Sequence, residues 1–431
     1  MALTKTEHSE YSLLLEYWIQ VRTFTRGLKS VQAYLQDVTS DTSPVGVKRN
    51  KEYKARATYV NFTARTRNSL IGSIFRKPAI AELPSSIDYM IDNADGTGMS
   101  LELVAKLGCT NLLEVGRVGL YVTFSGTQAK ITTYTAENCK DWKVDENGKL
   151  IRVELITGEK TEKHLVLDAQ CLYTVELYED SELQEVIEPQ QFSGARFDFI
   201  PFIFSGSTDN TPACDDLPLW SIVDLSRAHY QNSADMEDVA RYMLPTPFVT
   251  VTNKQWYDDI MGGKPYEFGN GAMIPVPEGG SAGLIQASPN QMHGEMMRHK
   301  EEQLVALGAR LISGNGTGQA ETAEATRLKF SAENSVLDGL VMNMSQAIKQ
   351  CLEWAQLYMS RSVEDVKYML NREYFDLTVN PQQIAADILL IDRGIVAVND
   401  VRHNLRKQGY LADDRTDEIL DDEVEINAGG L

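Results

Sequence analysis

The sequence has few cysteines, and none of them is paired in a recognisable motif. Five are scattered along 431 residues (Cys109, Cys139, Cys171, Cys214 and Cys351), with no CxxC and no metal-site spacing. This odd, dispersed set predicts reduced thiols and synthesis in the cytosol. The six histidines include no HExxH motif, and no GxSxG elbow occurs. We therefore expect no enzyme, no metal site and no cofactor.

Long apolar runs and an excess of positive charge are also missing. No stretch reaches the roughly 18 apolar residues of a membrane span. The opening residues, MALTKTEHSEYSLLLEYW, carry acids too early for a signal peptide, so we expect a soluble protein without a membrane partner. The 41 basic and 61 acidic residues give a formal net charge of −20, which on average repels DNA. That charge still permits a passage through which DNA slides without being gripped.

The N-terminal half combines helical and strand-like patterns. Helical spacing covers 11–36 (interrupted at Gly27), 51–77 (ended by Pro78) and 102–114. From about residue 116 the chain is rich in β-branched and aromatic residues separated by Gly turns, and Asn147-Gly148 is the clearest hairpin signal. Residues 1–210 therefore read as an α+β unit.

Long helices dominate the second half. Pro218 opens a helix that runs to 243 and ends at PTP, and Pro289 opens a second helix that runs to 312. Residues 245–288 between them are short, strand-like and punctuated by Gly and Pro. The longest helical pattern covers 321–360, and short helices over 381–394 and 399–409 precede an acidic tail. The whole chain is predicted to be α+β, helix-rich, with two or three structural units.

The stretch ISGNGTGQ (312–319) places three glycines at alternate positions before a helix start, which is how phosphate-binding loops are built. It lacks the Gly-Lys-Ser/Thr ending, however, and it follows a helix rather than a strand. Glu321 and Glu324 at the start of the next helix would repel a phosphate. We favour a flexible loop, and a nucleotide-binding enzyme is the alternative.

Three charged or titratable stretches each have a functional and a structural interpretation. The run from Asp235 to Asp238 suggests an acid/base or metal cluster, but a solvated helix face explains it better, because consecutive helical positions do not converge. His293 and His299 lie six residues apart, which favours surface histidines. The acidic end (413–425) holds eight carboxylates and one arginine. It fits a solvated tail, or a surface that keeps DNA away.

In its order of elements the chain resembles the bacteriophage portal proteins, in particular a family of short portals of tailed phages and prophages. No single motif is catalytic, so the resemblance rests on order and spacing. The stretches that carry it are YVNFTARTRNSLIGSIFRKP (59–78), LLEVGRVGLYV (112–122), FIPFIFSG (199–206), PLWSIVDLSRAHYQNSADMEDV (218–239), PTPFVT (245–250), LGARLI (307–312) and ETAEATRLKFSAENSVLDGL (321–340).

The resemblance implies a virion protein: a ring, normally of twelve subunits, at one capsid vertex. Double-stranded DNA would be packaged and ejected through its central channel. The implied partners are the terminase large subunit, which hydrolyses the ATP, a head–tail adaptor or neck protein, and the major capsid and scaffolding proteins. The implied parts are a wing (1–217), two stem helices (218–243 and 290–312), a clip (244–289), a tunnel loop (313–320), a long helix returning to the wing (321–379) and a short crown with the acidic tail (380–431).

Three sets of residues are candidates for contacts in such a ring. The tunnel loop combines flexible Gly314, Gly316 and Gly318 with uncharged Asn315, Thr317 and Gln319, which can touch phosphates without trapping them. Arg298 and Lys300 would form a basic ring in the channel or, alternatively, intersubunit salt bridges. Trp256, Tyr257 and Tyr266 would anchor an adaptor or pack between subunits. Another ring-forming head–tail connector or scaffold protein is the remaining alternative.

Overall fold

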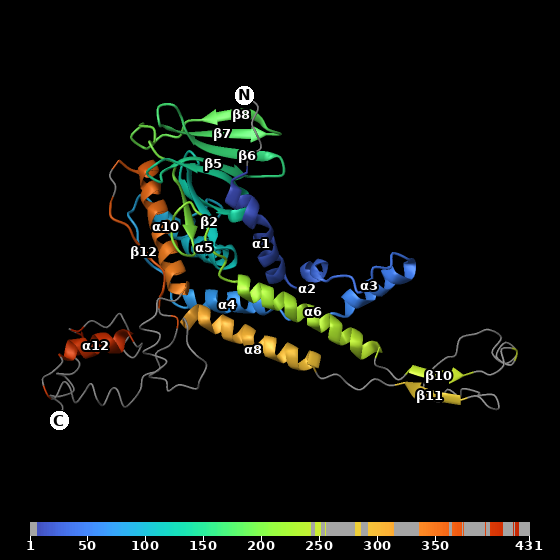
Figure 1. Cartoon of the computed structure of the whole chain (residues 1–431). Coiled ribbons are helices and arrows are strands. Elements are labelled where there is room, and N and C mark those ends of the chain that lie inside the picture. Colours follow the sequence, from blue (N-terminus) through green and yellow to red (C-terminus); the bar gives the residue numbers. More distant parts are fainter. Residues whose placement is uncertain are drawn as a thin grey trace. The chain divides into compact units, whose positions relative to one another are not determined.

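The computed structural model describes residues 7–242, 246–250, 255, 281–285, 292–313, 336–361, 364–372, 374, 393, 397–407, 417 and 419–421. The chain divides into two compact units, one formed by Met1–Ile71 with Ala79–Leu370 and the other by Gly72–Pro78 with Asn371–Leu431. Helices and strands are mixed in the first unit, so the predicted α+β class is confirmed (Figure 1).

The first predicted helix is confirmed with its interruption. Helix α1 (Ser9–Arg26) is capped by His8, whose side chain accepts a hydrogen bond from the Glu10 amide. It ends at Gly27, which has a φ of 105° that other residues rarely adopt. A short helix α2 (Leu28–Val31) and one 3₁₀ turn (Gln32–Tyr34) continue the chain. Trp18, Val21 and Phe24 on α1 are fully buried.

The single helix predicted over 51–77 is wrong, because the structure contains two. Helix α3 (Pro44–Arg56) begins earlier, where the Ser43 side chain accepts from the Gly46 amide and Pro44 occupies the first turn. Helix α4 (Phe62–Ile74) begins after Asn61, whose side chain accepts from the Ala64 amide. The break between the two helices is stabilised by Ser233, which is distant in the sequence. The Ser233 hydroxyl accepts a hydrogen bond from the Thr58 amide and donates one to the Thr58 carbonyl.

A three-stranded sheet forms the centre of the first unit. Its order is β3 (Ala129–Thr135), β2 (Arg117–Phe124) and β9 (Phe202–Gly206), and all pairs are antiparallel. Helices α5 (Leu101–Val115) and α10 (Val336–Met359) pack against this sheet and against each other. The predicted helix over 102–114 is thus confirmed. The first part of the predicted 321–360 helix, before α10, lies outside the described residues.

Glycine 116 fixes the junction between α5 and β2. Its φ of 74° is left-handed, and its amide donates to the Leu112 carbonyl to close the helix. A Cβ at this position would lie 2.5 Å from the Asp216 carbonyl oxygen, so no larger residue fits without displacement of the backbone.

A five-stranded antiparallel meander follows in the order β4-β5-β6-β7-β8. Its strands are β4 (Cys139–Val144), β5 (Leu150–Ile156), β6 (Thr161–Leu167), β7 (Tyr173–Glu179) and β8 (Glu182–Ile187). The predicted hairpin at Asn147-Gly148 joins β4 to β5, with Gly148 at a φ of 81°. Strand β6 occupies the middle of this sheet.

The predicted pair of long helices is confirmed, and the strand-like character predicted between them is confirmed for residues 246–250 and 281–285. Helix α6 (Trp220–Tyr242) is followed by β10 (Thr246–Thr250), which pairs antiparallel with β11 (Ser281–Ile285). Helix α8 (Met292–Ser313) comes next. Two short strands, β1 (Ile80–Glu82) and β12 (Lys367–Met369), also pair with each other. Among the described helices, none combines the length and apolar character needed to cross a membrane.

The second unit is described mainly through helix α12 (Val398–Lys407), which matches the helix predicted over 399–409. The helix predicted over 381–394 lies outside the described residues, apart from position 393. Of the acidic tail, only residues 417 and 419–421 are described.

Candidate functional site

Helices α6 and α8 lie side by side and run in opposite directions (Figure 1). On α8, Glu301 Oε1 lies 3.1 Å from His229 Nε2 on α6. Farther along, Thr246 pairs with Ile285 and Thr250 pairs with Ser281. Residues later in the first half of this segment thus lie opposite residues earlier in its second half. Helix α6, the β10–β11 hairpin and α8 therefore form one antiparallel structure, which we call the arm.

Aromatic contacts and close backbone approach hold the arm to α4 and to the segment before it. The buried His229 ring stands edge-on to Phe62 at 5.7 Å, and Tyr230 stands edge-on to Tyr59 at 5.4 Å. On the other helix, Gly308 lies so close to α4 that a Cβ there would be 3.3 Å from the Thr66 side chain. Both helices of the arm therefore contact α4, close to its N-terminus.

Charged side chains hold α3 to the far part of α6. Arg49 donates two hydrogen bonds to Asp238, at 2.7 and 2.5 Å, and Arg56 donates a third at 2.8 Å. The Tyr53 hydroxyl donates to Asp235 at 2.7 Å. The hydrogen bonds from Arg49 and, to a smaller extent, from Arg56 hold the pKa of Asp238 below its usual value. Burial, and then the hydrogen bond to Asp235, raise the pKa of Tyr53.

The interpretation of residues 235–238 as a solvated helix face is therefore wrong for Asp235 and Asp238. Both carboxylates face α3, whose partner residues precede them by more than 180 positions in the sequence. The signal that could have suggested the contact is on α3, where Arg49, Tyr53 and Arg56 fall at positions i, i+4 and i+7 and so share one helix face.

The two basic residues predicted for the channel have different surroundings. Arg298 is exposed on α8. Lys300 is half-buried and donates to the Ala228 carbonyl on α6 at 3.2 Å, and burial lowers its pKa although Asp235 opposes the shift. Their contact with DNA stays a prediction. The neighbouring His299 is exposed, as predicted, whereas the side chain of His293 lies outside the described residues.

The remaining predicted contact residues cannot be placed within the described part of the chain. The tunnel-loop residues Gly314, Asn315, Gly316, Thr317, Gly318 and Gln319 lie outside the described residues. Trp256, Tyr257 and Tyr266 of the predicted clip do so as well.

Helix α8 presents apolar side chains on both flanks of its contact with the rest of the chain. Leu304 is its buried residue among the side chains described on this helix. At about 100° per residue, Met292 and Met296 fall on one flank of Leu304 and Val305 falls on the other. All three are exposed, Val305 by 67%. The exposed apolar side chains described on α8 therefore lie on two different flanks of the helix.

Comparison with known proteins gives one family match. The model of a domain of unknown function, DUF4055, matches residues 218–359, from the start of α6 to the end of α10. No curated protein matches the sequence.

Several solved structures show some similarity to this chain. A chain in "Neck of empty GTA particle computed with C6 symmetry" shares 13% identity over 80% of this chain and 90% of that chain, with a TM-score of 0.47. A chain in "Neck of native GTA particle computed with C12 symmetry" shares 11% identity over 80% of this chain and 89% of that chain, with a TM-score of 0.47. A chain in "Virion of native gene transfer agent (GTA) particle" shares 13% identity over 90% of this chain and 98% of that chain, with a TM-score of 0.48.

Proposed function

We propose that this chain is the subunit of a bacteriophage portal, a ring at one capsid vertex through which double-stranded DNA is packaged and ejected. The observation that carries the proposal is the arm, in which two long antiparallel helices bracket a β-hairpin. This is the stem-and-clip succession that the sequence resemblance implies. In the proposed ring, α6 and α8 form the stem, β10–β11 belongs to the clip, and the two sheets belong to the wing.

The two apolar flanks of α8 support a ring rather than a simple dimer. A closed ring is built from head-to-tail contacts, so each subunit needs two different surfaces, one for each neighbour. Met292 and Met296 lie on one flank and Val305 lies on the other. We propose that these flanks face the preceding and the following subunit, normally among twelve.

The mixed charge of the arm is compatible with a channel that binds the DNA backbone only weakly. Near the middle of α8, the exposed Arg298 is followed by Glu301 and Glu302, so no continuous basic stripe forms on the described face. A strongly cationic channel would bind the DNA backbone tightly and slow its movement. We propose that the uncharged tunnel loop touches the moving DNA, with no catalysis in this chain and ATP hydrolysed by a separate terminase.

Negative-stain electron microscopy of the purified protein tests the proposal. We expect rings with a central channel at least roughly 20 Å wide, enough for a duplex. A compact monomer that binds ATP would overturn the portal proposal in favour of a nucleotide-binding enzyme. Rings too narrow for a duplex would instead favour another head–tail connector or a scaffold protein.

A loop variant tests the role of the tunnel loop separately. Deletion of residues 314–318 should leave ring assembly intact but impair DNA packaging or retention in particles. A deletion of equal length in the acidic tail, 421–425, is the matched control. Loss of ring assembly in the loop variant alone would show that the loop is structural.

A further inference from the structure

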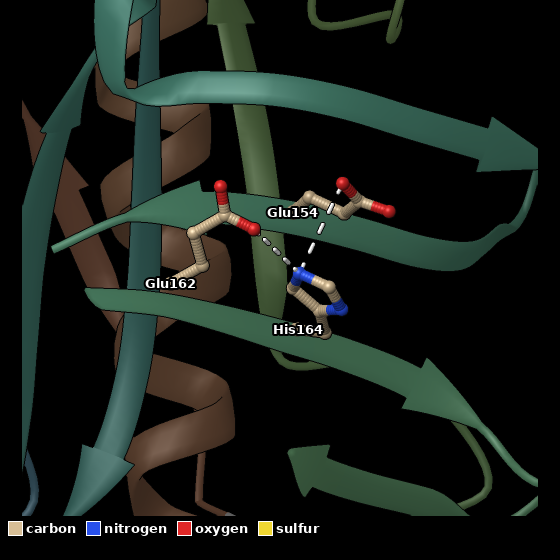
Figure 2. Close-up of side chains that lie close together, drawn as sticks. All are labelled: Glu154, Glu162 and His164. Carbon is tan, nitrogen blue, oxygen red and sulfur yellow. Dashed lines mark hydrogen bonds and ion pairs between the residues drawn. The ribbon is translucent and has the colours of Figure 1, made fainter. Parts of the chain in front are cut away.

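A buried histidine and two glutamates converge on one face of the five-stranded sheet (Figure 2). Glu154 on β5 lies directly opposite His164 on β6 in the strand register. Glu162 precedes His164 by two residues and so points to the same face of the sheet. The two strands therefore bring a ring nitrogen and two carboxylates together.

The converging atoms are His164 Nε2 and one oxygen from each carboxylate. Nε2 lies 3.3 Å from Glu162 Oε2 and 3.9 Å from Glu154 Oε2. His164 is 2% exposed and Glu154 is 8% exposed. The imidazole also packs against the Tyr178 ring, with centroids 4.3 Å apart, which restricts its orientation.

Each carboxylate is oriented by a cation on its other oxygen. Arg152 pairs with Glu154 Oε1, and Lys140 Nζ lies 3.1 Å from Glu162 Oε1. These partners leave Oε2 of both residues directed toward His164 Nε2 (Figure 2). Metal-binding carboxylates are commonly held by such outer hydrogen bonds.

Two carboxylate oxygens face one imidazole nitrogen. A protonated Nε2 donates one hydrogen bond, yet two acceptor oxygens face it. An unprotonated Nε2 would bring three acceptors together. Asp141 opposite Glu154 and Glu176 opposite His164 add negative charge on the same face, where Arg152, Lys140 and the exposed Lys143 are the cations.

We propose that His164 Nε2, Glu162 Oε2 and Glu154 Oε2 bind one divalent first-row transition-metal ion, with Zn²⁺ as the preferred ion and water as the fourth ligand. Tetrahedral bonds of 2.0–2.2 Å place ligand atoms about 3.3–3.6 Å apart. The observed 3.3 and 3.9 Å separations need only small side-chain movements to meet that geometry. The imidazole nitrogen favours Zn²⁺ over Ca²⁺ or Mg²⁺, which prefer oxygen ligands alone.

Such an ion would join β5 to β6 across the turn that connects them. Two ligands come from β6 and one from β5, so binding should raise the thermal midpoint of the folded protein as Zn²⁺ is added. The site is separate from the arm and does not depend on the proposed portal function.

Zn²⁺ binding to the untagged, full-length protein tests the proposal. Cys171 is exposed, so a Cys171→Ser background removes a competing thiol. Isothermal titration with Zn²⁺ alone should give one ion per chain. Glu162→Gln, at a half-buried position that should tolerate the change, should weaken binding at least about tenfold. With Co²⁺ as the probe, the visible absorption of a tetrahedral complex should appear in the parent protein and be lost in the variant.

The matched control is Glu185→Gln, the same substitution at an exposed position of β8 in the same sheet. It should bind Zn²⁺ as the parent does. The proposal is overturned if the parent, the Glu162→Gln protein and the Glu185→Gln protein bind Zn²⁺ equally, or if none binds it. In that case the three side chains form only a buried ion-pair network.

Discussion

Helices α10 and α8 are nearly equal in length, with 24 and 22 residues, but they are held in different ways. Twelve residues of α10 are buried, and the helix packs against both α5 and the three-stranded sheet. On α8, by contrast, Leu304 is the buried side chain among those described, and polar contacts with α6 do much of the rest. Helix α10 thus buries most of its apolar side chains within the single chain, whereas the described side chains of α8 leave Met292, Met296 and Val305 exposed.

This difference in burial indicates that α10 contributes mainly to the stability of the single chain, whereas α8 is available for contacts with other chains. Apolar burial contributes roughly 25 cal/mol per Å² removed from water, so α10 makes a large contribution to folding of the isolated chain. On α8, a further contribution would come from covering the exposed Met292, Met296 and Val305. In the proposed ring that cover comes from neighbouring subunits, and folding of one chain precedes completion of the stem.

The largest expected effect comes from opening a cavity beneath α10. Leu352 is 0% exposed, and Leu352→Ala should lower the free energy of unfolding by about 2–5 kcal/mol. Urea denaturation followed by near-ultraviolet circular dichroism measures it. Met342→Ala, at an exposed position of the same helix, is the control and should change that free energy by less than about 0.5 kcal/mol. Equal losses in the two variants would contradict the core role of α10.

A smaller effect is expected where α3 is held to α6. Asp238→Ala removes the shared partner of Arg49 and Arg56 and should cost about 1–2 kcal/mol. It should also speed proteolysis within residues 37–61, which limited trypsin digestion would detect. Asp224→Ala, in an exposed pair with Arg227 on the same helix, should change neither quantity measurably. Unchanged digestion of the Asp238 variant would show that other contacts hold α3.

The same contact has a defined dependence on pH. The pKa of Asp238 is lowered in the folded protein, so its stabilising contribution is complete above the unfolded pKa of about 3.9. It is lost as the pH falls through the folded pKa. The difference in unfolding free energy between the parent and Asp238→Ala should therefore be constant near neutral pH and shrink below about pH 4. A difference that stays constant into that acidic range would exclude this carboxylate as its source.

The smallest expected effect on the single chain comes from Val305 on the open flank of α8. Because Val305 is 67% exposed, Val305→Ala should alter monomer stability by less than about 0.5 kcal/mol. Val305→Asp should likewise leave the monomer folded but reduce the fraction of rings, measured by analytical ultracentrifugation. Rings that form equally well with aspartate at this position would mean that this flank is not a subunit interface.

Elements bounded by local signals could be predicted from the sequence. Pro218 and the PTP sequence bracket α6, and Asn147-Gly148 marks the β4–β5 hairpin. The start of α3 had an equally local signal in Ser43-Pro44, which the helical periodicity alone did not reveal. The helix break around Thr58 was different, because it depends on a hydrogen bond to Ser233, 175 residues away.

The same limit applies to the candidate sites. The role of Asp238 depends on a helix that precedes it by about 180 residues, so spacing along α6 could not show it. Glu162 and His164 share a face as soon as β6 is recognised as a strand. Their third partner, Glu154, depends on the β5–β6 register, and a slip of one residue would move it to the opposite face.

The close approach of Gly308 to Thr66 has a mechanical consequence. It gives α8 a tight contact near one end, while the other end of the helix begins at Met292. The 16 residues between span about 24 Å, so a tilt of roughly 10° at the contact displaces Met292 by about 4 Å. Such a tilt would have its pivot at Gly308, and it would have to strain or break the hydrogen bonds of Glu301 and Lys300 to α6. A larger residue at position 308 would stiffen or shift that pivot, and small rotations at the base would be magnified toward the hairpin end.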